Sequence, residues 1–263
     1  MDTRLQGLSV VIIARNAEKT IAKCLQSVSF IASEVIVVIN DCTDDTKSIA
    51  ESYGARVTEH EWSGFRDQKN FAISLAKYDW VLSLDSDEAL NNTAKASIKE
   101  VLSNANNKFS AYRFARKTLF LNKWVAYGSW YPDYNLRLFR NGCGKFVGGN
   151  VHERLEVSGK VKTLPGNILH YTCDSLEDFT KRNITYAELA AKDLFVKYSG
   201  KFCGKIQINI FVIIARSFWR FFRSYILKFG ILDGAVGYYL AKAESFMTFY
   251  KYFKLRDLML RKE

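Results

Sequence analysis

The sequence predicts an α/β fold in which a mixed sheet has flanking helices and a basic helical region follows at the C-terminus. Apolar, β-branched runs at residues 8–14 and 34–39 enclose an amphipathic stretch at 18–29, which is a β-α-β pattern. Continuous apolar strands joined by helices are typical of a parallel sheet that is covered on both faces. Residues 201–263 differ in composition, with an excess of basic and aromatic side chains.

The β-α alternation continues as far as a strand at residues 80–84, with helices expected at 46–53 and 65–77 and a strand at 56–58. Beyond residue 110 the pattern becomes one of alternating strands, at 111–120 and 134–140, with turns at Asn141-Gly142 and Gly148-Gly149. A helical pattern covers 176–198. We therefore expect a domain at 1–200, with halves at 1–110 and 111–200, and a helical tail at 201–263.

The composition excludes several classes of protein. A hydrophobic content of 48% with only two prolines indicates a folded chain without long disordered linkers. Five widely spaced cysteines, none in a C-x-x-C pair, argue against a disulfide framework or a zinc knuckle and suit a reducing cytoplasm. The first apolar run is too short for a secretion signal, and no uncharged apolar run is long enough to predict a membrane-spanning helix.

The tail accounts for most of the formal charge of +11, because residues 201–263 hold twelve Lys or Arg against four Asp or Glu. They also hold 15 of the 38 aromatic residues. Lys205, Asn209, Arg216, Arg220 and Arg223 share one face of a helix expected at 205–229, opposite a broad apolar face. This pattern predicts peripheral contact with an anionic membrane. The alternatives are packing on the catalytic domain or another subunit, and a nucleic-acid surface.

Acidic residues follow the strand at 80–84 directly, as Asp85-Ser86-Asp87-Glu88. Ligands commonly bind where the strands of an α/β sheet end. Carboxylates there can hold Mg²⁺ or Mn²⁺, which keeps further positions for water and phosphates and neutralises the charge on a departing diphosphate. The alternative is an acidic turn that caps a helix beginning near Ala89.

A second polar loop, residues 40–46, follows the strand at 34–39 and should share the same edge of the sheet. Asn40 and Asp41 could hydrogen-bond a nucleobase and ribose there, and Arg15 and Asn16 after the first strand could approach the same pocket. The alternative is a capping role, in which Thr43 or Asp44 accepts hydrogen bonds from amides of the next helix.

Four segments, LSVVIIARN, EVIVVINDCTDDT, GFRDQKNFAI and WVLSLDSDE, together resemble the family 2 inverting glycosyltransferases, which have the Rossmann-like GT-A fold. Three later segments, SWYPDYNLRLFR, FVGGNVHERL and ILHYTCDSLEDF, are similar to the bacterial lipopolysaccharide-core β-glucosyltransferase branch. The similarity extends over about residues 7 to 200. One departure is the stretch Ile39-Asn40-Asp41, where the family often shows two adjacent acids or Asp-Ser.

The resemblance implies a UDP-sugar donor, inverting transfer at the anomeric carbon, and a metal held chiefly by Asp87 with Asp85 close to the ribose or the metal. It also implies that Gln68, Lys69 and Asn70 help to hold the nucleotide. The residue that reads the base is either Asn40 or Asp41.

Inverting transfer needs a general base to take the proton of the acceptor hydroxyl. Glu153 lies where the branch shows a His-Glu pair and is the first candidate, and Asp133, before the strand at 134–140, is the second. His170 follows an apolar pair and is a candidate third metal ligand, with a structural role as the alternative. Arg137, Arg140 and Arg154 are weaker candidates for phosphate contacts.

We therefore expect a hexosyltransferase that transfers a hexose, glucose being the first candidate, to the inner core of lipopolysaccharide on the cytoplasmic face of the inner membrane. Alternative acceptors are a polyprenyl phosphate, a capsule repeat or a protein side chain. A non-catalytic family member and a nucleic-acid-binding protein are the alternatives outside catalysis, and carboxylates at the strand end argue against nucleic acid. The sequence predicts no oligomeric state.

Overall fold

The computed structural model describes residues 5–104, 107–148, 153–173, 175–199 and 209–261. The chain divides into two compact units. The first comprises Met1–Lys117 and Asp133–Tyr171, and the second comprises Thr118–Pro132 and Thr172–Glu263. These bounds differ from the division expected at residue 200, because helix α5 (Leu176–Ser199) groups with the C-terminal helices.

Four parallel strands form one half of the main sheet, in the order β3 (Arg56–Glu59), β2 (Glu34–Ile39), β1 (Leu5–Ala14) and β4 (Tyr78–Asp85). The strands predicted from apolar runs are thereby confirmed. The register pairs Ala14 with Ile39 and Ile13 with Asp85, so that β1, β2 and β4 end at the same edge.

The other half makes the sheet mixed, as predicted. β8 (Asp133–Arg140) runs antiparallel to β4, and β6 (Ala111–Phe120), β11 (Val161–Cys173) and β5 (Glu88–Leu90) follow in that order. The short strand β7 (Lys123–Trp124) pairs with the end of β6. A separate antiparallel pair consists of β9 (Gly144–Val147) and β10 (Arg154–Val157).

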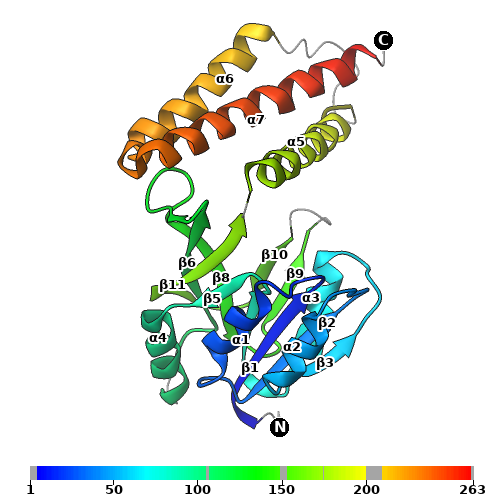
Figure 1. Ribbon diagram of the computed structural model, residues 1–263, viewed down its shortest axis with the longest axis vertical. Helices are drawn as coiled ribbons and strands as arrows, with labels where there is room; N and C mark the ends of the chain where they lie inside the picture. The colour runs from blue at the N-terminus through cyan, green and yellow to red at the C-terminus, as the bar shows by residue number, and fades with distance from the viewer. Residues whose placement is uncertain (1–4, 105–106, 149–152, 174, 200–208, 262–263) are drawn as a thin grey trace. The chain divides into compact units, whose positions relative to one another are not determined.

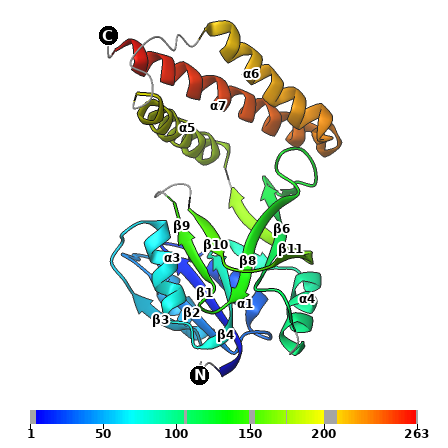
Figure 2. The ribbon, with the colours of Figure 1, turned by 180° about the vertical axis from the view of Figure 1, so that it is seen from behind.

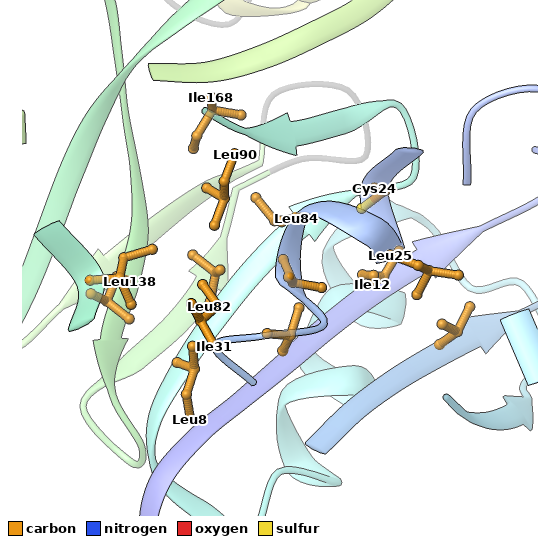
Figure 3. Packing of buried hydrophobic residues seen from close by; sticks show 14 of the residues in the cluster. Leu8, Ile12, Cys24, Leu25, Ile31, Leu82, Leu84, Leu90, Leu138 and Ile168 are labelled. Carbon is orange, nitrogen blue, oxygen red and sulfur yellow. The ribbon is translucent and has the colours of Figure 1, made fainter. Parts of the chain in front are cut away.

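Helices cover both faces of the sheet (Figure 1). α1 (Ile21–Val28), α2 (Thr46–Ser52) and α4 (Asn92–Ser103) share one core with β-strand residues such as Leu8, Ile12 and Leu82, several of which are shown in Figure 3. α3 (Phe65–Ser74) packs on the opposite face, in a core with Val11 and Ile36. Neighbouring residues of one strand thus enter different cores, which is why these strands are apolar at nearly every position.

The predicted helix at 18–29 begins three residues late, at Ile21. Ala17 N donates to Thr46 Oγ1 (2.7 Å) and Glu18 N donates to Asp44 Oδ2 (3.0 Å), so these amides are held outside the helix. Asp44 Oδ1 also accepts from Thr46 N, the first amide of α2 (3.1 Å). Asp44 therefore accepts from a helix amide as the alternative interpretation predicted, although the N-cap of α2 is Asp45, whose side chain makes no cap hydrogen bond.

The alternative interpretation of the acidic turn is wrong, because no helix begins near Ala89. Residues Glu88–Leu90 form β5, and α4 begins at Asn92 with its own cap: Asn91 Oδ1 accepts from Ala94 N (2.9 Å). Asp85-Ser86-Asp87 therefore connects two strands and caps no helix.

The second unit is mainly helical. α7 (Gly234–Leu260) lies beside both α5 and α6 (Ile210–Phe222) (Figure 2). A π-helix (Arg223–Leu227) and a 3-10 helix (Gly230–Asp233) join α6 to α7. Phe120, Phe179 and Leu240 are central to its core. The predicted helix at 176–198 is confirmed. Of the helix predicted at 205–229, residues 205–208, with Lys205, lie outside the described residues, and α6 and the π-helix cover 210–227. None of the helices described is long and apolar enough to cross a membrane.

Candidate active site

Three polar segments lie at the edge of the sheet where β1, β2 and β4 end: residues 15–16, 40–46 and 85–87. Asn16 links the first two, because its Oδ1 accepts from Thr43 N (2.9 Å). Asn16 and Asp41 both have positive φ, at 48° and 41°, a conformation that Asn and Asp tolerate better than most residues. The expectation that these loops share one edge is confirmed.

Asp85 is held between two cations. Its Oδ1 lies 2.9 Å from Lys69 Nζ of α3, and its Oδ2 lies 2.9 Å from Arg137 Nη2 of β8. Burial alone would raise the pKa of this carboxyl, but the charges of Arg137 and Lys69 and their hydrogen bonds outweigh it and hold the pKa well below its usual range. Asp85 is therefore ionised and fixed in orientation at neutral pH.

Arg137 also pairs with Glu88, which is fully buried. Arg137 Nη2 lies 2.6 Å from Glu88 Oε1, and Glu88 Oε2 accepts from Asp85 N (3.1 Å). Burial would lower the pKa of the Arg137 guanidinium, but Glu88 and Asp85 raise it above its usual value. The Glu88 carboxylate therefore orients the backbone of Asp85 directly, and it orients the Asp85 side chain through Arg137.

The two candidate bases occupy different surroundings. Glu153 Oε1 lies 3.1 Å from Lys69 Nζ, so that Lys69 joins Glu153 to Asp85. Asp133 Oδ2 instead accepts from Arg116 Nη2 (2.8 Å) and from Asn135 Nδ2 (3.0 Å). Glu153 thus belongs to the Asp85 cluster through a shared lysine.

Asp87 directly precedes β5, His170 lies in the paired strand β11, and their side chains are in contact. His170 Nε2 is 3.2 Å from Asp87 Oδ2, His170 is in register with Glu88, and Tyr171 N donates to Asp87 O (2.9 Å). Ligands in adjacent octahedral positions around Mg²⁺, each about 2.1 Å from it, are about 3.0 Å apart. The separation therefore suits two ligands of one divalent ion.

Asp85 does not complete a metal site with this pair in the structure. No group of three or more acidic, histidine or cysteine side chains with the arrangement of a metal site occurs among the described residues. Both Asp85 oxygens contact cations instead. Asp87 and His170 are a contacting pair that could hold a divalent ion together with water and phosphate oxygens.

The remaining residues predicted to bind nucleotide fall into two groups. Arg15 and Asp41 are exposed at the sheet edge, and Asn40 beside them is buried, with its Nδ2 donating to Asp41 Oδ2 (3.1 Å). Gln68 and Asn70 have structural partners. Gln68 is buried against His60, with His60 Nδ1 2.8 Å from Gln68 Oε1. Asn70 connects α3 to β9, because its side chain makes two hydrogen bonds of 2.9 Å with the Phe146 backbone.

Sequence reasoning missed Glu88 and Arg116 and gave Arg137 only a minor role. The available signals were local. Glu88 directly follows the acidic turn, and Arg137 is the charged residue inside the apolar strand Leu136–Phe139. In a strand covered on both faces, a charge has no solvent to face and needs a buried partner.

Cys24 is buried behind the acidic turn, with its Sγ 3.6 Å from Asp85 O. Burial raises the pKa of its thiol, and Glu88, Asp87 and Asp85 raise it further. The thiol is therefore protonated and unreactive at neutral pH.

A family model, "Glycosyl transferase family 2", matches residues 9–152, more than half of the chain. The chain is a family 2 glycosyltransferase. An uncharacterised glycosyltransferase of Rickettsia typhi is 30% identical over 98% of this chain and 89% of its own length. The family resemblance, the GT-A type of fold and the class of enzyme predicted from the sequence are thereby confirmed.

Two further likenesses involve proteins with named activities. The lipopolysaccharide core biosynthesis glycosyltransferase LpsC of Rhizobium meliloti is 28% identical over 70% of this chain and 70% of its own. Glucosyl-3-phosphoglycerate synthase of Mycobacterium tuberculosis, solved in complex with UDP, is 24% identical over 43% of this chain and 45% of its own, with a TM-score of 0.36.

The buried Glu88–Arg137 pair yields a stability prediction. Arg137→Met leaves the Glu88 carboxylate buried without a counter-charge, and we expect the free energy of unfolding to fall by about 3–5 kcal/mol in chemical denaturation. Arg137→Met combined with Glu88→Gln should recover much of that loss, because the uncompensated charge is gone. Arg154→Met is the matched control, since Arg154 pairs with Glu156 on the surface, and should cost less than about 1 kcal/mol. Equal losses for Arg137→Met and Arg154→Met would contradict this account.

Proposed function

We propose that this transferase moves a hexose, with glucose as the first candidate, from a UDP-sugar to the inner core of lipopolysaccharide or a related lipid-linked glycan. The observation that carries the choice of acceptor is the likeness to LpsC over 70% of both chains. The same proposal places the enzyme on the cytoplasmic face of the inner membrane.

The donor is proposed to lie at the shared strand edge. Asn40 and Asp41, with Arg15 and Asn16 beside them, would face the nucleoside, and Asp85 would lie close to the ribose. Lys69 is a cation in this part of the site that can approach the diphosphate, provided that it exchanges one carboxylate partner for a phosphate oxygen.

Mg²⁺ or Mn²⁺ would be held by Asp87 and His170, whose 3.2 Å separation suits adjacent ligand positions. When bound, such an ion supplies positive charge to the leaving diphosphate. Asp85 supports this site from two residues before Asp87, and its pairing with Arg137 keeps the acidic turn in place.

Glu153 is proposed as the general base. Its carboxylate would take the proton of the acceptor hydroxyl as the hydroxyl oxygen attacks the anomeric carbon, the glycosidic bond to the diphosphate breaks and UDP leaves. Lys69 orients this carboxylate from one side, at 3.1 Å, so that the other oxygen is free of that contact.

The function is tested by screening UDP- and GDP-sugars with Mn²⁺ or Mg²⁺ and following nucleotide release. We expect release with a UDP-hexose to rise at least about tenfold when extracted, heptose-containing core lipid is added. Polyprenyl phosphate is the comparison acceptor. Stimulation by polyprenyl phosphate alone would replace the acceptor in the proposal, and absence of release with any donor would contradict catalysis.

Metal ligands can be tested apart from activity by titrating Mn²⁺ into the protein with UDP and recording electron paramagnetic resonance. Asp87→Ala and His170→Ala should each weaken Mn²⁺ binding by about tenfold or more, since each removes a direct ligand. His60→Ala is the matched control, because the His60 ring stacks on Phe71 and contacts Gln68. Unchanged affinity in both ligand variants would remove these residues from the metal site.

The base assignment predicts that Glu153→Gln lowers kcat by about 100-fold or more while the dissociation constant for UDP stays within about threefold. Asp133→Asn keeps the same shape and should lower kcat by less than about tenfold. Initial rates and calorimetric titration with UDP measure the two quantities. The opposite ranking of the two variants would move the base to Asp133.

A further inference from the structure

The second unit exposes an unusual number of large apolar side chains along α6 and the turn that follows it. On α6, Phe211 is 75% exposed, Phe218 65% and Trp219 55%. In the turn, Phe229 and Leu232 are each 61% exposed. Their exposed neighbours are Val212, Ile214, Ile226, Leu227 and Ile231. We call this set, residues 211–232 with their exposed apolar side chains, the apolar ridge.

The orientation of α6 is the reverse of that usual for an amphipathic helix in water, whose apolar face packs inward and whose charged face is exposed. Its arginines point toward α7: Arg220 Nε lies 3.2 Å from Glu244 Oε2, and Arg216 Nη1 donates to Tyr252 Oη (3.2 Å). The side chains of Phe211, Ile214 and Phe218, spaced at helical intervals, are exposed instead. Exposed apolar surface of this extent on a soluble protein marks a place of contact with another apolar phase or partner.

The turn at 226–232 is held rigidly from beneath. The buried carboxylate of Asp233 accepts from Ala126 N (3.1 Å) and Tyr127 N (2.9 Å), and Lys228 O accepts from Gly128 N (2.8 Å). Phe229 has left-handed backbone geometry, with φ of 57°. These hydrogen bonds fix the turn at 226–232, the tip of the apolar ridge, before any partner binds. Little conformational entropy is therefore lost on binding.

The charged residues within the chain segment that forms the apolar ridge are all basic. No Asp or Glu occurs between residues 201 and 232, whereas Arg223 is exposed and Lys228 is half-buried beside the tip. The first acid after this stretch, Asp233, is 3% exposed and occupied with backbone amides. In a symmetric dimer through this surface, Arg223 and Lys228 of one copy would lie near the same cations of the other copy. The resulting repulsion disfavours such a dimer.

We propose that the apolar ridge inserts into the interfacial layer of an anionic lipid leaflet, with Arg223 and Lys228 at the level of the headgroups. Apolar side chains at the headgroup–acyl boundary flanked by cations are the chemistry of peripheral membrane binding. The inference deepens the proposed function, because a surface that lies on lipid brings the enzyme to a lipid-borne acceptor. Its evidence is the ridge itself and does not depend on the identity of that acceptor.

The test is flotation of the full-length protein with vesicles of phosphatidylcholine, alone or with phosphatidylglycerol. The turn variant is Phe229→Asn with Leu232→Gln, since Asn tolerates the left-handed backbone. The helix variant is Phe211→Gln with Phe218→Gln. Phe30→Gln with Val196→Gln is the matched control, because those side chains are 87% and 70% exposed elsewhere in the chain. The charge variant is Arg223→Gln with Lys228→Gln.

We expect the wild-type and control proteins to bind the anionic vesicles equally. The turn and helix variants should each bind at least about tenfold more weakly. The charge variant should lose about fivefold per cation on anionic vesicles only, with a smaller dependence on salt. All the replaced side chains are at least partly exposed, so thermal unfolding should be nearly unchanged. If the turn variant unfolds, the helix variant alone decides.

No binding by the wild-type protein, or equal binding by the wild-type, turn and helix proteins, would overturn the proposal. So would a dimer, detected by analytical ultracentrifugation, that the turn and helix variants disrupt while vesicles remain unbound. The vesicles contain neither donor nor glycan. Flotation therefore reports on the ridge alone, and nucleotide release measured without vesicles reports on the transferase alone.

Discussion

The pairing of Asp85 with Arg137 and Lys69 is the constraint on which the site depends. It ties the end of a parallel strand, β4, to the antiparallel strand β8 and to helix α3, and Lys69 extends the network to Glu153 just before β10. Glu88 beneath it neutralises Arg137 and holds the Asp85 amide. Because a buried charge without a partner is costly, no member can be lost without strain on the others. The arrangement therefore keeps the acidic turn in one conformation before any ligand binds.

The sequence predicted the parallel strands well, because strands covered on both faces need continuous apolar runs, and residues 8–14, 34–39 and 80–84 show them. It missed β5, since three residues between an acidic turn and a helix cap carry too little pattern. The late start of α1 depends on Asp44 and Thr46, which lie more than 25 residues further along the chain. Such a contact has no local signal.

The site shows the same limit at the level of single residues. Gln68, Lys69 and Asn70 matched a family motif, but successive helical residues point about 100° apart and cannot all face one ligand. Lys69 points to the acidic cluster, Gln68 to His60 and Asn70 to β9. Asp87 and His170, in contrast, lie in contact as predicted, although they are 83 positions apart in the sequence. The apolar and cationic faces of α6 were likewise predictable from periodicity. That the cationic face packs on α7 was not, because it depends on contacts with Glu244 and Tyr252.

One feature of the acidic cluster bears on how the enzyme would meet its substrate. Asp85, Glu88 and Glu153 share two cations, Lys69 and Arg137, and Asp87 beside them contacts His170. This excess of negative charge attracts a divalent ion and repels a bare diphosphate. We therefore expect a nucleotide diphosphate to bind together with a divalent ion rather than alone, because the repulsion acts before any hydrogen bond to the nucleoside forms.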